Sequence, residues 1–93
     1  MSSLSSEYIV EATQLVESKI HSLQQLSYDQ ASALSETEEV NLLIANEKAS
    51  LTTFRQTDAL NLNGKILVVV LAAKRRHFGL SSIHVERGLV FSP

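Results

Sequence analysis

The sequence contains no cysteine and no tryptophan, and only 5% of its 93 residues are aromatic. Without cysteine, the chain can form neither a disulfide nor a thiolate zinc site, and it has no thiol nucleophile. The scarcity of aromatic residues means that any core must be aliphatic, and the hydrophobic content of 44% is sufficient for one. Disorder of the whole chain is therefore not expected. The length predicts a single small domain over residues 1–93.

The motifs of several common binding sites are also missing. The three glycines form neither a phosphate loop nor a dinucleotide-binding fingerprint. The three histidines include no H-E-x-x-H pair, which would place two metal ligands on one helix face. We therefore expect no metal site and no cofactor.

Neither a signal peptide nor a membrane-spanning segment is recognisable in the sequence. Its first residues contain no basic segment followed by an apolar core, as a signal peptide would. The longest apolar run, residues 66–73, is shorter than the roughly 18 residues of a membrane-spanning helix. Because the absence of cysteine also fits a reducing compartment, we expect a cytoplasmic protein.

The run at residues 66–73 is the most informative segment that is present. It is rich in β-branched residues, follows Asn63-Gly64 and ends at a basic cluster, which is typical of a buried β-strand. Side chains alternate between the faces of a strand. The run therefore has two apolar sets: Ile66, Val68, Val70 and Ala72 on one face, and Leu67, Val69, Leu71 and Ala73 on the other.

Both faces of this strand need to be buried, since leaving one Val or Leu exposed forfeits about 1.5–3 kcal/mol. One long helix can cover only one face. The second face therefore predicts further local structure or another subunit, and we expect an oligomer.

A long N-terminal helix is predicted from residue 7 to about residue 26. The apolar residues Ile9, Ala12, Val16, Ile20 and Leu23 follow helical spacing. Residues 1–6 are expected to be frayed, with Ser5 or Ser6 as the N-cap. A capping box, Ser27-x-x-Gln30, predicts a short second helix over residues 28–34.

Residues 36–48 fit two structures. Another capping-box pattern, Ser35-x-x-Glu38, favours a helix, whereas Val40, Leu42 and Ile44 alternate as in a strand. We prefer a strand at about 39–45, because residues 46–48 make a good turn into a second strand at about 49–56. With further strands at about 65–75 and 82–91, the prediction is an α+β fold: a long N-terminal helix and a short helix packed on a four-stranded antiparallel β-meander.

Two turns suggest how the strands pair. If Asn63-Gly64 forms a two-residue type I′ turn, Leu60 faces Leu67 and a bulge is expected near residues 57–58. If the last loop centres on Gly79, Leu67 meets Phe91 and Val69 meets Leu89.

Charge is distributed unevenly along the chain. Residues 1–47 contain eight acidic residues and one basic residue, a net charge of −7, whereas residues 48–93 contain seven basic and two acidic residues, a net charge of +5. One interpretation is an acidic helical layer set against a basic sheet, within one subunit or between two. The other is a basic sheet that binds an anion. We favour the first, because uneven charge supports association and solubility more often than a specific site.

The basic cluster is the main candidate binding site. An anion or nucleic-acid site would use the residues Arg55, Lys74, Arg75, Arg76, His84 and Arg87. However, the net charge of the whole chain is −2, and charges beside an aggregation-prone strand also protect it as gatekeepers. A small enzyme that uses His77 or His84 as an acid or base is a third hypothesis.

The leading functional hypothesis is a non-enzymatic protein that works by association. Its simplest form is a homodimer through the uncovered face of the sheet, and a partner protein could replace the second copy. Neither a catalytic residue nor a membrane partner is predicted.

Overall fold

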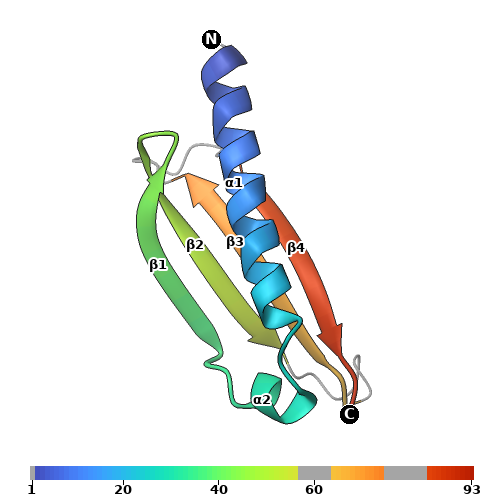
Figure 1. Ribbon diagram of the computed structural model, residues 1–93. Coiled ribbons are helices and arrows are strands. Elements are labelled where there is room, and N and C mark those ends of the chain that lie inside the picture. The colour runs from blue at the N-terminus through green and yellow to red at the C-terminus, as the bar shows by residue number, and fades with distance from the viewer. Residues whose placement is uncertain (1, 57–63, 75–83) are drawn as a thin grey trace.

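The computed structural model describes residues 2–56, 64–74 and 84–93, which form two helices and one sheet (Figure 1). The helices are α1 (Ser2–Leu23) and α2 (Tyr28–Ser32). The strands are β1 (Thr37–Ile44), β2 (Glu47–Gln56), β3 (Ile66–Lys74) and β4 (His84–Phe91). They pair antiparallel in the order β1-β2-β3-β4, so the predicted α+β meander is confirmed. The ambiguous segment at residues 36–48 contains a strand and no helix.

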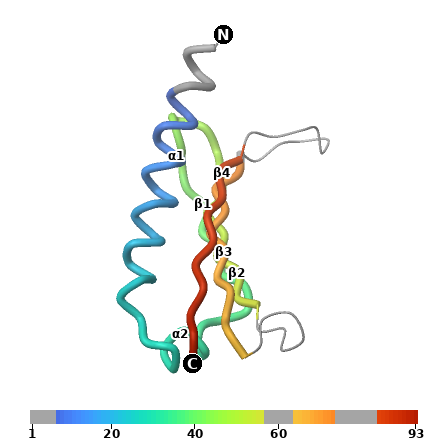
Figure 2. The backbone as a smooth tube through the Cα atoms, turned by 90° about the vertical axis from the view of Figure 1, so that its right-hand side faces the viewer, coloured from blue at the N-terminus to red at the C-terminus, as the bar shows by residue number. Residues whose placement is uncertain are grey.

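Helix α1 lies along one face of the sheet and covers it mainly over β3 and β4 (Figures 1 and 2). Its buried stripe consists of Tyr8, Ala12, Val16, Ile20 and Leu23. The predicted stripe began at Ile9, but that side chain is 44% exposed and Tyr8 takes its place in the core. The helix also begins at Ser2, so the expected N-cap at Ser5 or Ser6 is wrong.

The short helix α2 is held at its start by the predicted capping box. The Ser27 side chain accepts a hydrogen bond from the Gln30 amide at 3.1 Å, and the Ser27 amide donates to the Gln30 side chain at 2.9 Å. Together these contacts satisfy two amides that a helix start otherwise leaves unpaired. The Tyr28 hydroxyl donates to the Gly64 carbonyl at 2.5 Å, which joins α2 to the segment that leads into β3.

The hairpin between β1 and β2 turns earlier than predicted. Ala45 and Asn46 both have positive φ, at 51° and 64°, and β2 begins at Glu47. Two positive-φ residues between paired strands form the type I′ turn that suits their twist. The Glu11 carboxylate accepts a hydrogen bond from the Ala45 amide at 2.7 Å, which fastens the turn to α1.

The predicted strand registers are both wrong. Leu67 pairs with Gln56 and not with Leu60, while residues 57–63, where the bulge was expected, lie outside the described residues. Between β3 and β4, Phe91 pairs with Ile66, one residue from its predicted partner. Because strand side chains have a period of two, this single step moves every β4 side chain to the opposite face.

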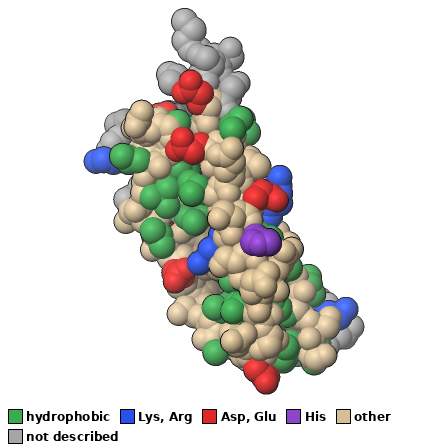
Figure 3. Space-filling view, viewed as in Figure 1, with side chains coloured by type: hydrophobic (Ala, Val, Ile, Leu, Met, Phe, Trp, Pro, Cys, Tyr) green, Lys and Arg blue, Asp and Glu red, His purple; other side chains and the backbone are tan. Residues whose placement is uncertain are grey.

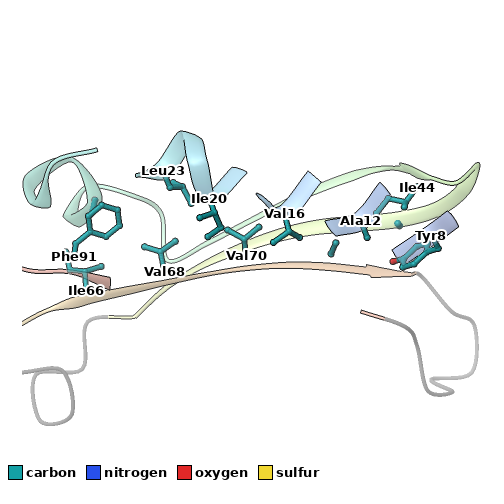
Figure 4. Close-up of a cluster of buried hydrophobic side chains, with 13 residues drawn as sticks. Tyr8, Ala12, Val16, Ile20, Leu23, Ile44, Ile66, Val68, Val70 and Phe91 are labelled. Carbon is teal, nitrogen blue, oxygen red and sulfur yellow. The ribbon is translucent and has the colours of Figure 1, made fainter. Parts of the chain in front are cut away.

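The core lies between α1 and the sheet, as Figure 4 shows. From β3 it takes Ile66, Val68, Val70 and Ala72, which are at most 1% exposed. The molecule is a two-layer slab with extents of 45 × 27 × 19 Å. Its radius of gyration is 14.6 Å, whereas a compact domain of this length has a value of about 12 Å.

Candidate interaction surface

The candidate site is the face of the sheet that points away from α1, which we call the far face. Its centre is the second apolar set of β3, namely Leu67, Val69, Leu71 and Ala73, and all four are half-buried. In the described part of the chain, no helix or strand covers this face (Figure 2). The same strand is fully buried on its other side, where Val68 and Val70 are 0% exposed.

The neighbouring strands extend the apolar area of the far face. The register places half-buried Phe54 of β2 beside Val69, and Val90 of β4 beside Leu67. Val90 is 51% exposed, and Leu43, near the end of β1, is 60% exposed. Charged residues on this face lie on the two edge strands and beside the first hairpin: Glu39 on β1, His84 and Glu86 on β4, and Lys48 near the start of β2. The far face is therefore apolar along β3 and at Phe54, polar at Ser50 and Thr52 of β2, and charged at its rim. A charged rim around an apolar strip is the usual anatomy of a protein interface.

Two ion pairs connect the acidic helix to the sheet on the other side. The Arg87 guanidinium lies 2.9 Å from the Glu17 carboxylate, and the Lys19 ammonium lies 3.4 Å from the Glu38 carboxylate. The pair between Glu17 of α1 and Arg87 of β4 fits the first interpretation of the charge asymmetry, within a single subunit. The pair between Lys19 of α1 and Glu38 of β1 has the opposite polarity. Because the side chains are largely exposed, each pair contributes little to stability.

The described members of the predicted basic cluster do not gather on one face. Arg55 pairs with Val68 and Arg87 with Val70, so both lie on the helix side, whereas His84 pairs with Ala73 on the far face. His84 lies 3.9 Å from Glu86 of the same strand. Arg75, Arg76, His77 and the Lys74 side chain lie outside the description, so an anion site that uses them stays a prediction.

The helix side has one apolar feature that the sequence did not reveal. Val40 is 47% exposed, and it lies beside half-buried Leu51 in a patch between α1 and the β1 edge. Figure 3 shows hydrophobic side chains gathered over β1 and β2 there. The patch remains open because α1 contacts β3 and β4 much more than β1. The sequence does contain one indication of this patch: a single helix is narrower than a four-stranded sheet, so part of the sheet face must remain uncovered.

Two hollows lined by described residues open on the helix side of the molecule. The larger, about 460 Å³, lies between α1 and the first hairpin, and its lining includes Glu7, Glu11 and Asn46. The smaller, about 260 Å³, lies beside the Lys19–Glu38 pair. No histidine lines either hollow, and among the described residues no group of three His, Asp or Glu could hold a metal ion.

One titratable group in the core is clearly perturbed. Burial raises the pKa of the Tyr8 hydroxyl above its ordinary value of 10.0, and the negative charge of Glu47 raises it further. Tyr8 belongs to α1, and its ring lies in the core between the helix and the sheet.

Comparisons with other proteins add no further assignment to the far face. In the part of the chain that the structure describes, no helix has both the length and the apolar character needed to span a membrane. Searches against protein-family models, curated proteins and solved structures found no match to this chain.

Proposed function

We propose that this protein works by association and forms a homodimer through the far face. The observation that supports the proposal is the contrast within β3, where Val68 and Val70 are 0% exposed and their neighbour Val69 remains half-buried. A sheet that is apolar on both faces gains from a second covering layer. Two copies packed face to face supply that layer and produce a helix–sheet–sheet–helix assembly.

The dimensions of the far face are close to those of a specific, reversible interface. Its four strands are 8 to 10 residues long. With a rise of about 3.4 Å per residue and a strand spacing of about 4.8 Å, the face measures roughly 500–600 Å². If all four strands overlap, two such faces together reach the roughly 1,000 Å² expected of a specific interface. Sheets that pack in this way keep their strands within about 30° of each other.

Light scattering tests the proposal directly. We expect a mass of two chains at micromolar concentration, falling to one chain on dilution. A single-chain mass at the highest accessible concentration would refute the homodimer.

Two matched valines then identify the face that is used. Val90 and Val40 both lie on edge strands and are 51% and 47% exposed, but Val90 is on the far face and Val40 is on the helix side. Val90→Lys places an unpaired charge in the proposed interface, so we expect the dimer Kd to rise at least tenfold. Val40→Lys should leave the Kd unchanged. The opposite result would assign the interface to the helix side.

A further inference from the structure

The largest and the smallest apolar positions of the far face lie in one row across the sheet. Val69 pairs with Phe54 on β2 and with Gly88 on β4. Phe54 is the only phenylalanine among the described far-face residues, and Gly88 is exposed and has no side chain. The row therefore contains a half-buried aromatic ring, a central valine and a notch at the edge strand.

The fold of a single chain does not require glycine at position 88. Its backbone is not among the positive-φ positions. A Cβ atom added there would lie 3.5 Å from the Leu67 Cδ1 atom and 4.0 Å from the Val68 carbonyl oxygen, which are ordinary contact distances. The missing side chain thus leaves room on the outside of the sheet, where another chain could insert a group.

The spacing of this row is self-complementary under two-fold symmetry. Phe54 and Gly88 lie on the strands immediately on either side of Val69. A two-fold axis that runs along β3 in the interface brings β2 of each copy over β4 of the other. Val69 then meets its own equivalent, and each Phe54 ring lies over the Gly88 notch of the second copy. Strand β1 of each copy lies outside this overlap, which covers about three quarters of the far face.

Charge disfavours the neighbouring placement of the axis. The residues Glu39, Thr52, Leu71 and Glu86 form the next row across the sheet. An axis between β2 and β3 would place Glu39 of each copy opposite Glu86 of the other. Such like-charge contacts weaken association. An axis along β3 instead places Glu86 opposite Thr52.

We infer that the dimer is symmetric about β3 and that Phe54 of each copy inserts into the notch at Gly88 of the other. This inference rests on the proposed far-face dimer and adds its registration. It identifies a second copy of this chain as the partner that fills the notch.

A double-mutant cycle on the dimer Kd tests the inference. Phe54→Ala removes the ring, and we expect the Kd to rise roughly thirtyfold, the size of an interface hot spot. Gly88→Ala narrows the notch and should raise the Kd roughly tenfold. In the double variant the added methyl no longer meets a ring, so the combined rise should be far smaller than the product of the two single effects.

Controls separate this inference from the proposed function. Val40→Ala on the helix side should leave the Kd unchanged, and Phe54→Leu offers a smaller change if the alanine variant does not fold. A wild-type protein that stays monomeric would refute both the far-face dimer and its registration. A wild-type dimer that Val90→Lys weakens, but in which the Phe54 and Gly88 effects simply multiply, would overturn only the registration.

Discussion

Two adjacent valines on β3 give the sharpest test of which face the chain covers by itself. Val70 points toward α1 and is 0% exposed, whereas Val69 points to the far face and is half-buried. Both have the same backbone setting in a central strand, so the change in β-propensity on substitution by alanine largely cancels in the comparison. The difference between the two variants therefore reports burial.

The expected magnitudes follow from that burial. Val→Ala at position 70 removes two buried carbons at about 0.8 kcal/mol each. The cavity left under α1 adds to this loss, so we expect the free energy of unfolding to fall by about 2–3 kcal/mol. At position 69 the same carbons are already partly hydrated and water fills the space, so the monomer should lose only about 0.5–1 kcal/mol.

Urea unfolding at two protein concentrations measures both values. Association stabilises the folded state by mass action, so the wild type should become more stable as its concentration rises. We expect the loss at Val70→Ala to be the same at both concentrations and the loss at Val69→Ala to grow at the higher one. An equal, concentration-independent loss at the two positions would show that the chain covers its own far face, and it would refute the reasoning for a dimer.

Three other predictions concern local structure and pH. Ser27→Ala removes the N-cap acceptor of α2 and should lower the free energy of unfolding by about 1 kcal/mol in urea titrations. Ser27→Asn, which keeps an acceptor at the N-cap, should retain most of the wild-type stability. Replacing Ala45-Asn46 by Asn-Gly should stabilise the hairpin by about 1 kcal/mol, since both positions have positive φ; a lower melting temperature would contradict this turn. Because the pKa of Tyr8 is raised by burial and then by Glu47, stability should be full below pH 10.0 and fall as the pH rises above it; Tyr8→Phe should lessen this alkaline loss in pH-dependent unfolding.

The elements were predictable from the sequence wherever one periodicity dominates. The stripe through Ala12, Val16 and Ile20 has the spacing of a helix face, and the capping box at Ser27 has the geometry that its spacing predicts. The alternation at Val40, Leu42 and Ile44 also outweighed the competing helix signal, because a hairpin partner was available. In each case, local pattern and tertiary packing favour the same structure.

The hairpin turn was harder to predict because its first residue is atypical. Alanine seldom adopts the φ of 51° found at Ala45, so the pattern moved the predicted turn toward residues 46–48. The hydrogen bond from the Ala45 amide to Glu11 provides a tertiary compensation that the sequence does not display. Long-range contacts of this kind are the reason that turn positions are less certain than the strands they connect.

The β3–β4 register failed for a different reason, which also bears on the proposed dimer. Because β3 is apolar on both faces, it can pair with β4 in either register. The choice depends on which β4 side chains are then buried against α1. In the observed register Leu89 and Phe91 face α1, and Arg87 reaches Glu17 at 2.9 Å. The predicted register would move those two apolar side chains out of the core, at a cost of about 1.5–3 kcal/mol each.

Most apolar residues of β4 therefore pack on the helix side. The apolar residues of β4 that lie on the far face are only Gly88 and Val90. The interface must then depend on β3 and Phe54, with little hydrophobic area from either edge strand. An interface of that composition is smaller and less apolar than the core of a permanent dimer. We therefore expect each copy to fold around α1 alone and to associate reversibly, so that dilution separates the dimer before the chain unfolds. Loss of far-ultraviolet helical signal at the same dilution as loss of the dimer would contradict this order.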